Sequence, residues 1–187
     1  MGNHPCLPAR ERPRTARKRG YSFGWRLRQS ICEDDGKRGR NGEDDIGYDG
    51  NKKVKGRKRH IIVDTLGHLL GVFVSAANLG DREGAKTVLE QCRGLYPRLK
   101  KLWADGGYTG DFVEWVSEQF DIDVEIVLRS DDVKGFVVIP HRWVVERTFA
   151  WLGRYKRLLR DYELCPLHSE SMIYAAMTHL LLRRLAE

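Results

Sequence analysis

Two apolar runs of strand length, joined by a short turn, constrain the fold of this chain more than any other feature. Residues 57–64 read RKRHIIVD, residues 69–76 read LLGVFVSA, and the intervening TLGH is typical of a turn, so we expect an antiparallel hairpin. Downstream, the apolar spacing predicts a helix over 82–93 capped by Asp81, a strand over 99–105, a helix over 110–120 capped by Thr109, a strand over 124–128, and helices over 141–160 and 169–185. This order predicts a mixed α/β domain in which helices cover a sheet.

The first 46 of the 187 residues show neither the spacing of a strand nor that of a helix. They are rich in Arg, Gly, Pro and Asp, a composition typical of disordered chains. We expect residues 1–46 to form a disordered basic segment and residues 47–187 to form the ordered domain. No apolar run is long enough to cross a membrane and the N-terminus shows no secretory signal, so we expect a cytoplasmic protein.

Positive charge is concentrated in the first third of the chain. Residues 1–60 contain 17 Lys or Arg against 8 Asp or Glu, whereas residues 61–187 contain 16 against 18. A basic segment on a nearly neutral domain favours a polyanionic partner, usually nucleic acid. A basic tail without a partner is the alternative that composition leaves open.

The densest part of this charge lies directly before the first apolar run. Six of the eight residues from 52 to 59 are basic, which is enough to neutralise several phosphates and predicts salt-dependent binding. The alternative is a solvated run of charge beside a strand, although a run this dense next to an apolar strand favours nucleic acid. The candidate DNA-binding residues here are Lys52, Lys53, Lys55, Arg57, Lys58 and Arg59.

Asp105 ends a short apolar run, LWAD, and two glycines follow it. A carboxylate at the carboxyl end of a sheet strand lies where α/β folds place their sites, and the glycines leave space for a metal ion or a substrate backbone. Asp-Gly-Gly is equally common as an ordinary turn. The residues alone therefore leave both interpretations open.

The helix expected over 141–160 has two stripes of side chains. The apolar stripe is typical of a face that packs on a core, and its members are Val145, Phe149, Leu152 and Leu159. Beside it lie Arg142 and Glu146, followed by two small residues that allow close approach to Glu146. Arg147 and Arg154 flank this stripe and are candidates for phosphate contacts. The alternative is a simple ion pair between Arg142 and Glu146, one helical turn apart.

These three segments, in this order, resemble the DDE transposases of bacterial insertion sequences. GYDGNKKVKGRKRHIIVDTLG is similar to the family's segment after its first catalytic aspartate, WADGGYTG to the segment with the second, and HRWVVERTFAWLGRYKRLLRDYE to the helix with the glutamate. Arg142 and Glu146 match the family's Arg-x3-Glu signature, and the resemblance covers residues 47–187. The chain departs from the pattern at Gly153, where the family has a basic residue, and Arg154 follows it.

The resemblance implies a ribonuclease-H-like α/β fold, a mixed sheet flanked by helices. It implies three carboxylates that hold two divalent ions, Mg²⁺ or Mn²⁺, for attack of a water or a 3′-hydroxyl on a DNA phosphodiester. Asp105 and Glu146 match two of these carboxylates, as catalytic residues and metal ligands, while Arg142 and Arg147 would orient them or bind the strand. The implied partners are DNA at the terminal inverted repeats of the element and a second copy of the transposase.

The family's first aspartate is missing from this chain. It belongs to a segment similar to DSQSVKTTENGG, which nothing in residues 1–46 matches. Residues 28–37 read RQSICEDDGK, and one permitted coding of them, read one base later, gives DSQSVKTTE. We hypothesise that the chain up to about residue 39 is translated from the wrong frame. The domain would then be N-terminally incomplete, would lack its first strand and would bind its metal ions weakly.

Asp64, at the end of an apolar run, and Asp49, in a loop, are alternatives for the third carboxylate, although the resemblance has both in addition to it. The expected function is that of an insertion-sequence transposase in a truncated or frameshifted copy with impaired catalysis, acting in the bacterial cytoplasm at the nucleoid. The first alternative is a non-catalytic DNA-binding fragment or an inhibitor of an intact transposase. The second is a translated pseudogene product without a function.

Overall fold

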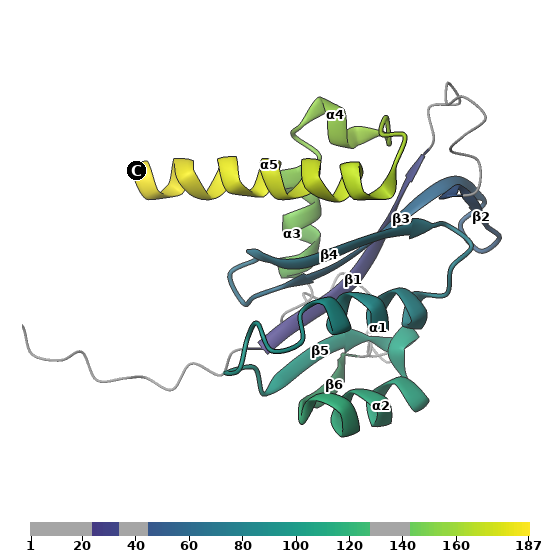
Figure 1. The fold of residues 1–187 in the computed structure, drawn as a ribbon, viewed down its shortest axis with the longest axis vertical. Helices are drawn as coiled ribbons and strands as arrows, with labels where there is room; N and C mark the ends of the chain where they lie inside the picture. Colours follow the sequence, from purple (N-terminus) through teal and green to yellow (C-terminus); the bar gives the residue numbers. More distant parts are fainter. Residues whose placement is uncertain (1–23, 34–44, 128–142) are drawn as a thin grey trace, which may run out of the picture.

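A computed structural model of the chain describes residues 24–33, 45–127 and 143–187 (Figure 1). Its strands are β1 (Gly24–Glu33), β2 (Gly47–Asp49), β3 (Val54–Val63), β4 (Leu69–Ala76), β5 (Lys101–Asp105) and β6 (Asp123–Val127). Its helices are α1 (Asp81–Gln91), α2 (Asp111–Phe120), α3 (Trp143–Leu152), α4 (Lys156–Leu159) and α5 (Pro166–Ala186), with a 3-10 turn η2 (Gly106–Tyr108) after β5.

The strands form one mixed sheet with β1 near its centre. β1 pairs antiparallel with β3 on one side and parallel with β5 on the other, and β5 pairs parallel with β6. The far side of β3 pairs antiparallel with β2 at its start and with β4 along the remainder. The carboxyl ends of β1, β5 and β6 therefore lie toward the same edge of the sheet.

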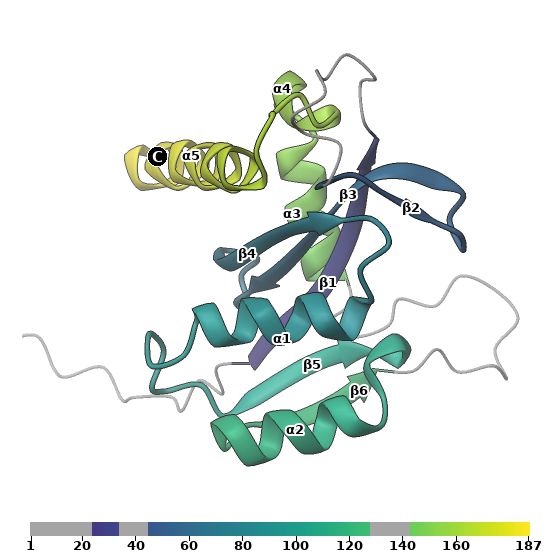
Figure 2. The ribbon, with the colours of Figure 1, turned by 45° about the vertical axis from the view of Figure 1, so that its right-hand side comes forward.

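Helices cover both faces of this sheet. Side chains alternate along a strand, so the neighbours Ile61 and Ile62 of β3 belong to different cores. Ile62 packs with α1 and α2, in a core that also contains Leu102 and Ala104 of β5. Ile61 packs on the opposite face with residues of α3 and α5. Figure 2 shows α1 in front of the sheet and α3 behind it.

The outer edge of β4 is covered by α5. The backbone N–H of Val74 donates to the carboxylate of Glu170 at 2.8 Å, and that of Val72 donates to the hydroxyl of Tyr174 at 3.3 Å. Burial raises the pKa of Glu170 above its ordinary value, and the hydrogen bond from Val74 opposes this. Side chains of the last helix thus provide acceptors that a further strand would otherwise supply.

Strand β1 corrects two expectations. The prediction that residues 1–46 have no regular structure is wrong for residues 24–33, and so is the prediction that the sheet lacks its first strand. Residues 25–31 read WRLRQSI, in which three of the four odd positions are apolar, but this alternation is short and lies in an arginine-rich segment. Backbone hydrogen bonds on both sides of the strand hold it inside the sheet. Residues 1–23 and 34–44, which the same prediction covered, lie outside the described residues.

The long helix expected over 141–160 is divided. α3 ends at Leu152, Gly153 and Arg154 form a turn, and α4 begins after Tyr155, whose backbone is extended. Glycine is a poor helix former, which accounts for the break at this point. The other expected elements are confirmed with ends shifted by up to three residues, although Gly80 and Gly110, not Asp81 and Thr109, are the N-caps. None of the helices in the described part of the chain is long and apolar enough to cross a membrane.

Candidate active site and DNA-binding surface

Asp105 ends β5, and its partly exposed carboxylate lies at the carboxyl edge of the sheet. Its Oδ1 accepts a hydrogen bond from Gly107 N at 3.0 Å, so the side chain caps the turn η2. Arg82 Nε donates to the carbonyl of Gly107 at 3.0 Å and joins this turn to α1. The Asp-Gly-Gly sequence therefore forms an ordered turn that fixes the position of the carboxylate.

Glu146 lies in the first turn of α3, where its side chain is exposed. The neighbouring Val145 is buried and packs in the same core as Ile61, so α3 covers that face of the sheet. Ala104 belongs to the opposite core, and alternation along β5 consequently places Asp105 on the face that α3 covers. The two carboxylates named from the sequence thus lie on one side of the sheet.

Asp64 is engaged by its own turn. Its Oδ1 accepts hydrogen bonds from the N–H groups of Leu66 and His68, both at 2.8 Å, and its Oδ2 lies 2.9 Å from His68 Nδ1. Thr148 Oγ1 donates to the carbonyl of Gly67 at 2.8 Å and docks this turn on α3. Asp64 therefore shapes the turn between β3 and β4 and is a poor candidate for the missing carboxylate.

Asp49 is buried, and its carboxylate binds groups of the neighbouring turn and strand. Its Oδ1 accepts hydrogen bonds from the N–H groups of Asn51 and Lys52 at 2.9 and 3.0 Å, and its Oδ2 lies 3.1 Å from Lys58 Nζ. The hydrogen bond from Lys52 is the largest cause that holds the pKa of Asp49 below its ordinary value; burial opposes it and Lys58 adds to it. Asp49 fixes the turn between β2 and β3.

The residues that the structure describes do not fit a site for two divalent ions. Asp105 and Glu146 are placed on a common face, but the two alternatives for a third carboxylate serve turns. Within residues 24–33, 45–127 and 143–187, no group of three His, Cys, Asp or Glu side chains is placed to hold a metal ion. Because two metal ions that act on one phosphate need several oxygen ligands each, two carboxylates are too few.

Arg57 belongs to the interior rather than to a DNA-binding surface. Its side chain is fully buried, and its Nη1 lies 3.3 Å from Asp161 Oδ2 and donates to the carbonyl of Glu163 at 2.9 Å. Its Nη2 donates to the carbonyl of Leu164 at 2.9 Å and lies 3.5 Å from Asp45 Oδ2. This corrects the expectation that Arg57 contacts DNA, because its charge is compensated inside the protein.

The expectation that Lys58 and Arg59 contact DNA is corrected as well, because both side chains are buried. Lys58 is 5% exposed, and its Nζ lies within 3.1 Å of Asp49 Oδ2 and within 3.0 Å of Asp81 Oδ1. Arg59 is also 5% exposed, and its Nη1 donates to the carbonyl of Leu158 at 2.8 Å. Residues 57–59 of the basic run therefore bind groups of neighbouring segments and hold β3 against them.

Lys52, Lys53 and Lys55 are exposed, in contrast to the rest of the run. They lie at the turn between β2 and β3 and at the start of β3, and Lys53 has a positive φ of 55°. The turn that Asp49 fixes thus presents three ammonium groups to solvent. These lysines are the part of the run that a polyanion can reach.

Arg147 lies between two tryptophan rings. Its Cζ is 4.3 Å from the ring centroid of Trp143 and 4.7 Å from that of Trp151, and its Nη2 donates to the carbonyl of Leu66 at 2.6 Å. The stack continues to Arg184 of α5, whose Cζ is 4.1 Å from the Trp151 ring. Arg147 therefore braces α3 against the β3–β4 turn. Its expected companion, Arg142, lies outside the described residues.

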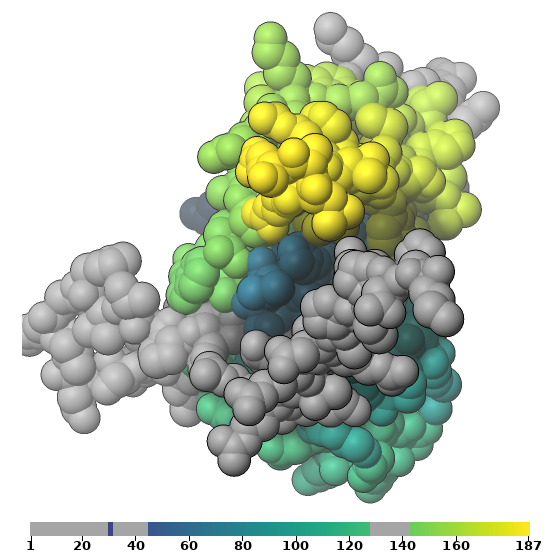
Figure 3. Space-filling model, turned by 90° about the vertical axis from the view of Figure 1, so that its left-hand side faces the viewer, coloured from purple at the N-terminus to yellow at the C-terminus, as the bar shows by residue number. Residues whose placement is uncertain are grey.

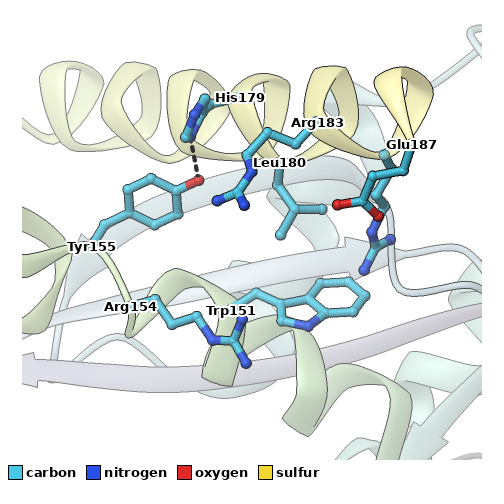
Figure 4. A pocket seen from close by; sticks show the side chains of 8 residues that line it. Trp151, Arg154, Tyr155, His179, Leu180, Arg183 and Glu187 are labelled. Atoms are coloured by element: carbon cyan, nitrogen blue, oxygen red, sulfur yellow. Dashed lines mark hydrogen bonds between the residues drawn. The ribbon is translucent and has the colours of Figure 1, made fainter.

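A basic pocket of about 330 Å³ opens between α3 and the last turns of α5 (Figure 4). Trp151 and Arg154 line it from below, and His179 lines it from α5, where its Nδ1 lies 2.9 Å from the Tyr155 hydroxyl. The other lining residues are Leu180, Arg183, Arg184 and Glu187. In Figure 3 the yellow end of α5 lies beside the green surface that includes α3. Three arginines against one glutamate suit the pocket to a phosphate group.

The sequence predicts Arg154 as a candidate phosphate contact, but it does not predict which residues line the same pocket. Arg183 and Arg184 come from a helix that begins at Pro166, and spacing along the chain does not reveal that α5 crosses α3. The only signal was an arginine pair in the last turn of an expected helix. The contact between α3 and α5 depends on tertiary packing, which the local spacing of apolar residues does not predict.

Comparison with known proteins identifies the class. The family model described as "Transposase DDE domain" matches residues 14–182, a range that begins well before residue 47. The chain therefore belongs to the DDE transposase domain family, whose members generally use divalent metal ions. Over 115 residues it is 31% identical to "Putative transposase for insertion sequence element IS402" of Burkholderia cepacia, covering 58% of this chain and 54% of that relative. The chain thus spans about half the length of the curated relative.

Proposed function

We propose that this protein is an insertion-sequence transposase that acts on DNA at the ends of its own element, and that its strand-cleaving site is impaired. Its family and its insertion-sequence relative support the transposase origin. The sheet supports a ribonuclease-H-like fold, because antiparallel β4, β3 and β1 are followed by parallel β5 and β6, with helices on both faces. Such a protein would work at the bacterial nucleoid, bound to terminal inverted repeats.

The observation that carries the impairment is that Asp105 and Glu146 lie on one face of the sheet and that the described part of the chain places no third carboxylate with them. Mg²⁺ or Mn²⁺ would be the ions that these oxygen ligands prefer. Two carboxylates would hold such an ion weakly, since each remaining position must be filled by water. DNA binding depends on exposed cations and not on this site, so it is expected to persist.

A nicking assay tests the proposal. The purified chain is incubated with Mg²⁺ or Mn²⁺ and a duplex that carries the terminal repeats flanking its gene, beside Asp105→Ala and Glu146→Ala variants. We expect no nicking above the level of either variant, from protein whose circular dichroism shows a folded domain. Nicking that both substitutions abolish would demonstrate a complete site and would contradict the impairment.

A second candidate function is inhibition of an intact transposase by a copy that binds DNA without cleaving it. The observation that favours it is the exposure of Lys52, Lys53 and Lys55, which can contact DNA although the cleavage site is incomplete. Adding the chain to an intact transposase of the same element should reduce strand transfer in proportion to the amount added. No reduction at a large molar excess would eliminate this function.

A further inference from the structure

Strand β1 runs beside β5, and this pairing gives each residue of β1 a defined neighbour. The paired residues are Gly24 with Lys101, Trp25 with Leu102, and Arg26 with Trp103. Paired residues of parallel strands advance together, so two further residues bring position 28 level with Asp105. The residue at position 28 is an arginine.

Position 28 also belongs to the sheet face on which Asp105 lies. On its other side it pairs with Ile61 of β3, and Ile61 packs with Val145 of α3. Residues paired directly across two strands share a face of the sheet, so position 28 lies on the face that α3 covers. α3 carries Glu146 and contacts β1. Position 28 is therefore flanked by the strand that ends in Asp105 and lies under the helix that carries Glu146.

Arginine is the wrong residue type for a metal site at this position. A guanidinium group has five N–H donors and no acceptor, and it stays positively charged at every pH at which proteins fold. It offers no oxygen ligand to a divalent cation, and its charge opposes one. The mismatch between this chain and a metal-dependent site therefore centres on one residue of the central strand.

The codons permitted for this segment provide a second argument that position 28 is the site of the missing carboxylate. The reading one base later that yields DSQSVKTTE begins at the second base of codon 28, so its aspartate falls in place of Arg28. This argument depends on permitted codons and on the resemblance to the transposase segment, whereas the strand register depends only on backbone pairing. The two are independent, and both lead to residue 28.

We infer that residue 28 occupies the position of the missing carboxylate and that the arginine there is what prevents this site from holding divalent ions. The inference rests on the proposed function, because it takes Asp105 and Glu146 as the other ligands. A single substitution, Arg28→Asp, is then enough to create a divalent-cation site in this chain.

The test measures Mn²⁺ binding to the whole chain in the absence of DNA. Arg28→Asp is compared with Arg28→Asn, which has the same size and no charge, by thermal melting and by the electron paramagnetic resonance signal of free Mn²⁺. At a Mn²⁺ concentration about ten times the Kd, the melting temperature of Arg28→Asp should rise by roughly 4 °C. The unsubstituted chain and Arg28→Asn should show no shift.

Double variants decide whether the new site is the one inferred. Adding Asp105→Asn or Glu146→Gln to Arg28→Asp should remove the Mn²⁺ shift. A folded Arg28→Asp without a Mn²⁺ response, or a response that survives both additions, would overturn the inference. Failure of the proposed function would instead appear as loss of DNA binding, which this measurement does not use.

A crosslink tests the position even if Arg28→Asp does not fold. In an Arg28→Cys/Asp105→Cys variant, a short bifunctional thiol reagent should join the two positions, as peptide mapping would show. The matched control is Leu27→Cys/Asp105→Cys, because position 27 lies on the other face of β1. Folded protein that yields no 28–105 crosslink, or yields the control crosslink equally well, would contradict the register on which the inference depends.

Discussion

The imidazole of His60 is enclosed between β3, β4 and α1. Its Nε2 lies 2.9 Å from Ser75 Oγ, its ring stacks on Phe73 at 5.9 Å between centroids, and Gly84 of α1 lies so close that a Cβ there would meet the ring at 2.2 Å. Burial is the main cause that lowers the pKa of His60 to about 4; Asp81 opposes this effect and Lys58 adds to it. The folded protein therefore holds this histidine in the neutral form.

His60 should make the stability of the protein depend on pH between about 6.5 and 4. The unfolded chain binds a proton on this residue below its ordinary pKa, whereas the folded protein does not, so stability is full above pH 6.5 and falls as the pH falls. Between pH 7 and pH 5 the free energy of unfolding should drop by about 2 kcal/mol more than in His60→Gln. Urea titrations of both proteins at the two pH values measure the difference, and equal drops would contradict the assignment.

At the scale of elements, β3 is tied to the connection between α4 and α5. Arg57 binds Asp161 and the carbonyls of residues 163 and 164, and Arg59 binds the carbonyl of Leu158. Asp161 is 2% exposed, so its charge depends on protein partners and not on water. This group of contacts holds the C-terminal helices against the sheet.

Arg57→Ala should therefore lower the free energy of unfolding by about 3 kcal/mol or more, because it removes the cation that lies 3.3 Å from the buried carboxylate of Asp161. Lys55→Ala is the matched control, since it lies two residues away on the same strand but is exposed, and it should change stability by less than about 0.5 kcal/mol. Chemical denaturation followed by circular dichroism measures both. Similar losses in the two variants would show that Arg57 has no special structural role.

The elements that the sequence predicted are those whose own side chains carry the pattern. The β3–β4 hairpin was predictable because both apolar runs and the turn are local features. Asp105 became a candidate because it ends a strand, whereas Glu146 was proposed through the resemblance of its helix to the transposase family. β1 was missed because its place depends on the ladders that β3 and β5 supply. Arg57 was misassigned because a charge is expected at the surface unless its buried partners, here more than a hundred residues away, are known.

At the scale of the whole molecule, the net charge of +7 is a poor measure of the positive charge that DNA can reach, because several basic side chains are buried. Arg57 and Lys58 pair with carboxylates inside the protein and Arg59 is buried against the carbonyl of Leu158, whereas Lys52, Lys53 and Lys55 at the β2–β3 turn are exposed. Three arginines line the pocket between α3 and α5. We expect the three lysines to provide a measurable part of the affinity for DNA.

A variant that combines Lys52→Glu, Lys53→Glu and Lys55→Glu should bind element-end DNA more weakly and with less dependence on salt. If each lysine neutralises one phosphate, the slope of log K against log salt should fall in magnitude by up to about 3. Gel-shift titrations at several salt concentrations measure the slope, with Lys100→Glu/Lys156→Glu as the control at exposed positions elsewhere. An unchanged slope would exclude the turn as a DNA contact.

The cover that α5 places over β4 has a consequence for shortened versions of this chain. With the acceptors of Glu170 and Tyr174 removed, the N–H groups of Val74 and Val72 would face solvent on a strand flanked by apolar side chains. An uncovered strand of this kind recruits strands from other molecules. A chain that stopped before Pro166 is therefore expected to self-associate through β4, and α5 is expected to oppose such association in the full-length chain.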